Sequence, residues 1–419
     1  MKRTSYPAIA LALALAVATG SYIADKNGGS PLISSAQAQP APSPCTFPTA
    51  PAATPEQTAW QLFVAANCPS NGSKVAWENW IEQDDLYPAS GEMSPVEVAA
   101  LARTTPKRLH GSVLASVLAP SPTKANLLFL SPNTQCNAMN GPPSNVVPNA
   151  QICEEARLSP QAANFVTDNG YQIRPGQTAA AQAGKDIEFP APAVEVKVDW
   201  IPAASFKTPF TCAKPPAGVH VETIDGVCYA MAGMHISSKL LTNWLWATFE
   251  SQSMLTNPLR CMTFGPCSDP WGSVPATSGG GAGGFTQQSP ALQALMKQAN
   301  LAPEFSNYRL DGAQVNFMEP DGKTDSYLGN SVIEGENVGM TKNTASCITC
   351  HSVSSIKNDG TDGIKLLGPA GKAGKLVGPQ YKFDPGWIAR DFVWSMDFAC
   401  PGRPRCTVAA NAPTKAGKK

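Results

Sequence analysis

The spacing of hydrophobic residues along the chain follows two patterns, one typical of helices and one typical of strands. Over 55–66 apolar side chains recur every three or four residues behind Thr54, which predicts a helix with Thr54 as its N-cap. Over 194–201 three valines alternate with charged residues, the period of a strand with one buried face. Two apolar stretches within 219–233 flank an Asp-Gly turn at 225–226 and predict a hairpin.

Weaker patterns predict further elements. The stretch 239–250 fits either a helix or a buried strand. The others are a helical piece over 75–82, a short strand over 127–130, a helical turn over 153–158, a short helix over 290–299 and a strand over 308–316.

Proline and glycine, at 39 and 34 residues, predict long irregular connections, chiefly across 120–184 and 278–284. We therefore expect an α+β protein that forms a loop-rich, single compact unit with antiparallel strands in the middle.

The charge balance argues against nucleic acid as a partner. Lys plus Arg and Asp plus Glu each number 31, and the basic run at 415–419 is the one basic cluster. The sequence contains no glycine-rich phosphate loop, no His-Glu-x-x-His motif and no acidic calcium loop. The sequence therefore gives no motif-based reason to expect a bound nucleotide, a zinc protease centre or a calcium site.

The N-terminus resembles a secretory signal peptide. Lys2 and Arg3 precede an unbroken apolar run over 8–18, and a small-residue Ala-Gln-Ala site lies at 36–38. The run is shorter than the roughly 20 residues that span a bilayer, and no other segment is apolar enough, so we expect no stable membrane span. Cleavage after Gly20 and an uncleaved anchor are alternatives. All three predict export, to the periplasm or beyond the cell.

These features divide the sequence into four parts. They are a signal peptide at 1–38, an extended lead-in rich in proline and alanine at 39–54, one domain at 55–408, and a disordered tail at 409–419. After the signal, roughly 380 residues remain, enough to bury a substantial core.

Twelve cysteines need an explanation in an exported chain, and ten of them fall into five couples that are close in sequence. An even number favours disulfides, each worth roughly 2–3 kcal/mol through restriction of the unfolded chain. A zinc site that uses Cys261 and Cys267 is the alternative. The couples are Cys45 with Cys68, Cys136 with Cys153, Cys212 with Cys228, Cys261 with Cys267, and Cys400 with Cys406.

The last two cysteines belong to a motif whose chemistry follows from its spacing. Cys347 and Cys350 lie three positions apart, and His351 follows directly. On a helical turn two such thiols add to the two vinyl groups of one haem, and the adjacent imidazole becomes the proximal ligand of the iron. A redox dithiol would leave His351 unexplained. We therefore expect one covalently bound haem c, held in a helical, cytochrome c-like haem segment at about 328–400.

Several stretches resemble a group of exported single-haem cytochrome c family proteins of uncharacterised role. The resemblance implies secretion, one c-type haem and a domain larger than a small soluble cytochrome c, but no substrate. The stretches are Leu328 to Glu334, Ser346 to Ser352, Tyr308 to Gln314, Gly233 to Ile236 with Lys239, Trp244 to Glu250, Trp60 to Asn67, and Asp391 to Trp394. The chain departs from the group at Ser251 and Gln252, where a histidine usually follows Glu250.

The sixth ligand of the iron separates an electron carrier from a catalyst, because a strong ligand blocks small molecules and an open site admits them. Met396 lies on the side of the motif where small cytochromes place their methionine, although a core filler is the structural alternative. Met340 is a further candidate. His235 is either a buried, hydrogen-bonded histidine or a distal group, acting as a ligand or a proton donor. Lys239 reaches the same site if its segment is helical, and a solvated side chain is the alternative.

Three functions are compatible with one haem. The first is a periplasmic or secreted electron-transfer protein, whose partner is a redox protein or a small-molecule donor or acceptor. The second is a haem-dependent oxidoreductase, peroxidase-like or acting on small molecules, with an open distal site near His235. The third is a haem-based sensor. Some 300 residues before the motif favour the second, whereas the lack of an acid/base group beyond His235 favours the first. His110 and His220 receive no role.

Overall fold

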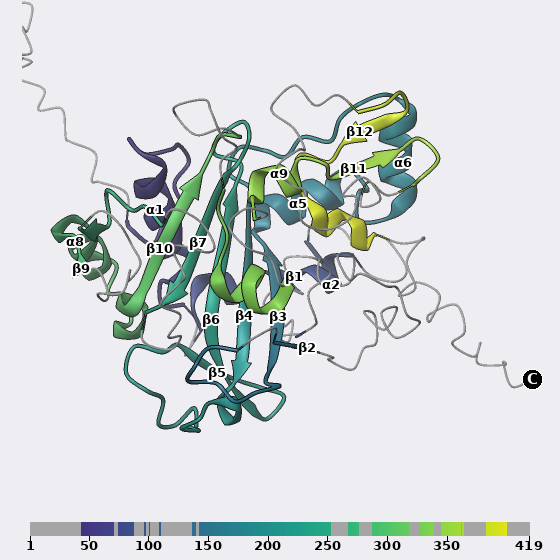
Figure 1. Ribbon diagram of the computed structural model, residues 1–419. Helices are drawn as coiled ribbons and strands as arrows, with labels where there is room; N and C mark the ends of the chain where they lie inside the picture. Colours follow the sequence, from purple (N-terminus) through teal and green to yellow (C-terminus); the bar gives the residue numbers. More distant parts are fainter. Residues whose placement is uncertain are drawn as a thin grey trace, which may run out of the picture. The chain divides into compact units, whose positions relative to one another are not determined.

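The valine strand predicted at 194–201 lies within an antiparallel sheet of eight strands (Figure 1). Its main order is β1-β3-β4-β6-β7-β10, with β2 beside β3 and β5 beside β6. The strands are β1 Ile81–Glu82, β2 Asn137–Ala138, β3 Gln151–Leu158, β4 Val194–Pro202, β5 Val221–Ile224, β6 Val227–Ser238, β7 Leu245–Ser251 and β10 Tyr308–Gln314. Two small ladders pair β8 Ser273–Val274 with β9 Gln287–Gln288, and β11 Ser355–Lys357 with β12 Trp387–Ala389.

The computed structural model describes residues 43–70, 74–87, 96–97, 100, 109, 136–139, 142–252, 267–275, 287–317, 327–338, 345–361, 363 and 383–399. These described residues form one compact unit. Its α-helices are α1 Pro55–Asn67, α2 Gln83–Leu86, α5 Pro160–Asp168, α6 Arg174–Gln182, α8 Pro290–Gln298 and α9 Cys347–His351. The 3₁₀-helices are η1 Ala76–Asn79, η3 Ala203–Ser205, η4 Pro303–Asn307 and η8 Trp394–Phe398, and η5 Ser331–Val338 is a π-helix.

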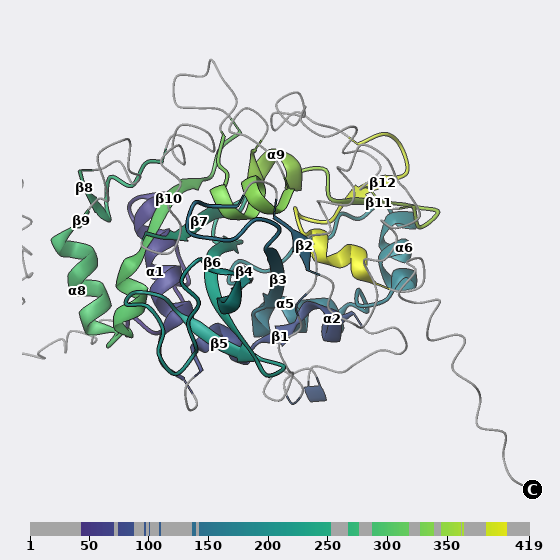
Figure 2. The ribbon, with the colours of Figure 1, turned by 60° about the horizontal axis from the view of Figure 1, so that its bottom comes forward.

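The two faces of the sheet pack against different elements. On one face the valines of β4 join α1 in a core that also includes Phe249 of β7 and Tyr308 of β10. Thr54 caps α1 as expected, because its side chain accepts a hydrogen bond from the backbone of Gln57. The other face is covered by the C-terminal segments that contain η5, α9 and η8, and Figures 1 and 2 show α9 on the side of the strands away from α1. The sheet therefore separates an apolar core from the segment that carries the Cys-x-x-Cys-His motif.

Most predicted elements are confirmed, including α1, β4, the β5–β6 hairpin, α8 and β10. The turn of the β5–β6 hairpin lies at Asp225 and Gly226, both of which have positive φ. The ambiguous stretch 239–250 ends in strand β7, not a helix. The short strand predicted over 127–130 lies outside the described residues.

Three predictions at the element level were wrong. The helical turn over 153–158 is strand β3, whose residues pair with β4 from Cys153↔Trp200 to Leu158↔Glu195. The helical piece over 75–82 is the 3₁₀-helix η1 followed by β1. The stretch 120–184, expected to be mainly loop, holds α5 and α6, and α5 begins at a Ser159 cap followed by proline.

Three of the predicted disulfides are present: Cys45–Cys68, Cys136–Cys153 and Cys212–Cys228. Cys267 is disulfide-bonded as well, although its partner is not among the described residues, and Cys400 and Cys406 lie outside them. Within the described ranges no helix is long and apolar enough to cross a membrane. The signal peptide at 1–38 and the tail at 409–419 lie outside those ranges.

Candidate functional site

The Cys-x-x-Cys-His motif forms the single helical turn α9. Gln314 at the end of β10 fixes this turn, because its side-chain oxygen accepts from the Ile348 backbone at 2.9 Å and its nitrogen donates to the Ser346 hydroxyl at 3.2 Å. Ile348 is fully buried, and Thr349 is 3% exposed. Both middle residues of the motif thus face the interior, which leaves the two cysteines and the histidine to face the other way.

Cys347, Cys350 and His351 line one cleft between α9, η8 and the sheet. About 1180 Å³ of space lies between its walls, including the part that opens to solvent. Apolar walls come from Ile236, Trp246, Ala247, Leu328 and Phe398, and the polar lining includes Glu154, Glu195, Lys197, His235 and Glu334. A cleft that is mostly apolar, with a few convergent polar groups, is typical of a cofactor or small-molecule site.

Both cysteines of the motif carry free thiols, whereas every other cysteine that the structure describes is disulfide-bonded. Burial raises the pKa of Cys350 to about 12 and that of Cys347 well above its usual range, and the Glu334 carboxylate adds to both shifts. The pair is therefore protonated at neutral pH, unlike the low-pKa thiolate of a redox dithiol.

The His351 imidazole is held in one orientation by its neighbours. Its Nδ1 donates a hydrogen bond to the Phe392 carbonyl at 2.7 Å, and its ring packs on Trp246 with the ring centres 4.4 Å apart. Burial lowers the pKa of His351 to about 4, so the ring is neutral at pH 7. With the proton on Nδ1, the lone pair of Nε2 is available to a metal, the arrangement that metal-binding histidines use.

The Phe392 carbonyl is presented by a strained turn. Asp391 and Phe392 both have positive φ, 48° and 69°, a backbone region that costs such residues about 1–3 kcal/mol each. The Asp391 carboxylate holds the turn, since it accepts from the Lys239 ammonium at 2.6 Å and from the Phe189 backbone at 2.8 Å. Lys239 is therefore neither at the cleft nor in solvent. It forms a buried ion pair behind the histidine.

The floor of the cleft is the polar face of the sheet. Lys197 of β4 pairs with Glu154 of β3 at 2.9 Å, and the neighbouring carboxylates raise its pKa although burial alone would lower it. Glu195, two residues earlier, has its pKa raised to about 7 by burial. Side chains along β4 thus alternate between the two faces of the sheet, with the valines in the core and Glu195 and Lys197 on the cleft.

His235 lies on this floor, in the middle of β6. Its Nε2 is 3.5 Å from the Glu334 carboxylate, and its side chain is 17% exposed. Burial would raise the pKa of Glu334, but His235, Lys197 and a hydrogen bond from the Asn330 backbone lower it below its usual value. Charge on His235 in turn lowers the pKa of His351, so the two imidazoles are close enough to interact electrostatically across the cleft.

The π-helix η5, which carries Glu334, is fixed to the sheet by hydrogen bonds. The Asn330 amide donates to the Thr248 hydroxyl at 2.8 Å and to the Phe249 carbonyl at 3.1 Å, and Ser331 donates twice to Glu250. Gly233 of β6 permits the close approach, because a Cβ there would lie 3.0 Å from the Asn330 side chain. A π-helical turn of this kind often marks a functional site.

Met396, the other distal candidate, lies elsewhere. It is fully buried within η8, in the core cluster that includes Val393 and Phe398, and it is not among the residues that line the cleft. Met340 lies outside the described residues. The structure thus brings His235 together with the motif and leaves Met396 in a packing role.

Sequence reasoning missed three contributors to this site. Glu334 and Glu195 face the cleft, and the Phe392 carbonyl holds His351. Glu195 could have been found from the sequence, because it is one of the charged residues that alternate with valines along β4. The Phe392 carbonyl could not, because no sequence pattern identifies a backbone carbonyl in a left-handed turn.

Comparison with known proteins adds no family. No protein-family model matches the chain, and no curated protein and no solved structure matches it either.

Proposed function

We propose that this chain is an exported c-type cytochrome that binds one haem in the cleft around α9 and transfers electrons. The observation that carries the proposal is the joint placement of Cys347, Cys350 and His351 on one cleft. The two thiols are free in a protein whose other described cysteines are oxidised, and His351 has its Nδ1 committed to a carbonyl.

The residues present fit a covalently bound haem. Cys347 and Cys350 supply the thiols that form thioether bonds with its vinyl groups, and His351 supplies Nε2 to the iron. Trp246 and Leu328 offer apolar walls for a flat macrocycle. When bound, a haem iron supplies a one-electron ferric/ferrous couple.

The rest of the chain has a defined part in this proposal. The Phe392 carbonyl and Trp246 orient His351 and keep its proton on Nδ1, which raises the basicity of the ligating nitrogen. The charges of Glu154, Lys197 and Glu334 surround the site and set the local electrostatic field. A redox protein or a small-molecule donor or acceptor is the proposed partner.

Export to the periplasm or beyond the cell is part of the same proposal. Disulfides form and persist in oxidising compartments, and three described pairs are bonded. The N-terminal pattern of a signal peptide and the resemblance to exported single-haem cytochromes support the same location.

One observation favours a second function, a haem-dependent oxidoreductase. His235 and Glu334 form a close imidazole–carboxylate pair on the cleft, the type of pair that moves protons to and from a bound small molecule. Met396 does not line the cleft, so the described residues offer His235 and no methionine there. The two functions share the haem and differ in whether His235 binds the iron.

Absorption and resonance Raman spectra of the purified mature protein test the proposal, because they report iron coordination directly. The electron-transfer protein with His235 as sixth ligand predicts a low-spin ferric spectrum that becomes high-spin in His235→Ala. The oxidoreductase predicts a ferric protein that binds cyanide and peroxide with His235 in place. Met396→Ala should leave both spectra unchanged, and a purified protein without haem would contradict both functions.

A further inference from the structure

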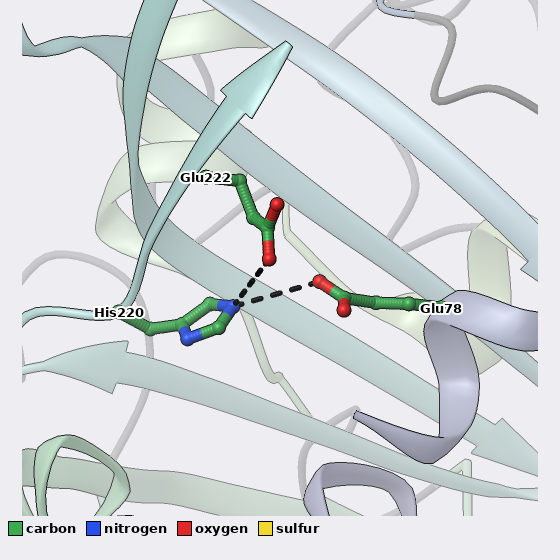
Figure 3. A group of neighbouring side chains, drawn as sticks. All are labelled: Glu78, His220 and Glu222. Carbon is green, nitrogen blue, oxygen red and sulfur yellow. Dashed lines mark ion pairs between the residues drawn. The ribbon is translucent and has the colours of Figure 1, made fainter. Parts of the chain in front are cut away.

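A second cluster of ligand-type side chains surrounds His220, just before β5. Three carboxylates from three segments meet this imidazole: Glu78 of η1, Glu222 of β5 and Glu304 of η4. Figure 3 shows Glu78 and Glu222 pointing at the same nitrogen of the ring. The cluster is separate from the cleft around α9, and none of its four members lines that cleft.

The geometry around Nε2 of His220 is that of a metal site with its ligands slightly apart. Nε2 lies 3.6 Å from Glu78 Oε1 and 4.0 Å from Glu222 Oε1, and the three donor atoms fall within 4.8 Å of one another. Ligands 2.0–2.2 Å from a tetrahedral zinc ion lie about 3.4 Å apart. A small contraction of the group therefore completes three coordination positions.

A third carboxylate faces the other nitrogen of the ring. The Glu304 carboxylate lies 3.7 Å from Nδ1. An anion beside Nδ1 favours the tautomer with its proton there, which turns the lone pair of Nε2 toward Glu78 and Glu222.

The supporting residues fix the ligands in place. Glu78 is fully buried, and its second oxygen accepts from the Val75 backbone at 3.0 Å, which aims the first oxygen at His220. The His220 ring packs on Phe305, with ring centres 4.8 Å apart. His220, Glu222 and Glu304 also line a cavity of about 970 Å³, which provides a path for an ion and its water ligands.

We propose that His220, Glu78 and Glu222 bind a divalent transition-metal ion of the zinc class, with Glu304 as the carboxylate that orients the imidazole. One imidazole with two carboxylates is a donor set that zinc accepts, and the cavity supplies a fourth, water-filled position. A bound divalent cation would compensate the negative charges of the Glu78 and Glu222 carboxylates, which are buried or half-buried. The site is independent of the haem proposal.

Calorimetric titration of Zn²⁺ into the intact mature protein, after treatment with a chelator, tests this site. We expect one equivalent to bind, with an affinity that falls at least tenfold in Glu222→Gln and in His220→Gln. Glu304→Gln should weaken binding roughly 10–100-fold, the usual effect of losing an orienting partner. Asp225→Asn, an exposed change at the turn of the same hairpin, is the matched control and should bind as the wild type does.

Circular dichroism spectra establish that each variant is folded. If His220→Gln does not fold, Glu222→Gln and Glu304→Gln still test whether the site binds Zn²⁺. The Glu222 and Glu304 side chains are 20% and 29% exposed and tolerate the change. Absence of Zn²⁺ binding by the wild type, or binding of equal strength in the folded Glu222→Gln and Glu304→Gln variants, would overturn the proposal. The first result would leave His220 as an ion-pair partner of its three carboxylates.

Discussion

Burial raises the pKa of Glu195, on the floor of the cleft, to about 7 from an ordinary 4.5. Below that pH it is neutral, and above it a negative charge faces the proposed haem site. An anion near the iron stabilises the ferric form, so the reduction potential should fall as pH rises from about 6 to 8. Redox titration at a series of pH values measures this slope.

In Glu195→Gln the fall over that window should shrink, because the group that titrates is gone. Asp168→Asn removes a carboxylate from the exposed end of α5 and serves as the control, since it should keep the wild-type slope. An unchanged slope in Glu195→Gln would assign the pH dependence to another group.

At the residue scale the sequence identified the groups whose chemistry depends on local spacing. Cys347, Cys350 and His351 are adjacent in the chain, so their joint orientation follows from one helical turn. His235 could be proposed as a partner but not placed, because it reaches the cleft only through the pairing of β6 with β4 and β7. His220 received no role for the same reason: two of its three carboxylate neighbours come from η1 and η4, far away in sequence.

At the element scale the contact of η5 with β6 depends on Gly233. An added Cβ would lie 3.0–3.3 Å from Asn330 and Ile333, so Gly233→Ala should destabilise the fold by about 1 kcal/mol and Gly233→Val by about 2–3 kcal/mol. Chemical denaturation measures both. Thr223→Val, a change of similar shape at an exposed position of β5, should have an effect below about 0.5 kcal/mol. Equal stability of the wild type and Gly233→Val would show that η5 does not approach β6 closely.

The turn behind His351 gives a prediction that separates positioning from packing. Asp391→Asn removes the close carboxylate partner of Lys239, which is 9% exposed, and leaves it Glu188 at 3.9 Å, so the change should cost about 3 kcal/mol. The turn then holds the Phe392 carbonyl less firmly, His351 becomes a weaker base, and the reduction potential should rise. Lys239→Met combined with Asp391→Asn should recover part of the stability but not the potential. Recovery of both would mean that the turn does not position His351.

Elements with a strict local period were predictable, as α1, β4 and the β5–β6 hairpin show. The errors arose where tertiary pairing overrode a weak local signal. Strand β3 pairs with β1, β2 and β4 along its edges and is buried on both faces, so its apolar and charged residues do not alternate cleanly. The cleft also depends on the strand order β3-β4-β6-β7, which cannot be predicted from any local pattern in the sequence.

At the scale of the whole molecule the disulfides join segments outside the core to the sheet and to α1. Cys45–Cys68 closes a 23-residue separation between the lead-in and the end of α1, so Cys45→Ala with Cys68→Ala should lower stability by about 3 kcal/mol. Thermal unfolding measures the loss. The spectrum of the haem site should not change, because neither cysteine lines the cleft. An altered spectrum would show that this bridge also shapes the site.

Covalent attachment through Cys347 and Cys350 requires that the haem stay on these cysteines when non-covalent haem is extracted. Mass spectrometry of the proteolytic peptide that contains residues 347–351, taken from mature protein after acid-acetone extraction, measures this. We expect this peptide to retain the mass of one haem, and Cys347→Ser with Cys350→Ser to abolish the adduct. A peptide that carries two unmodified thiols, or a disulfide between them, would rule out thioether attachment.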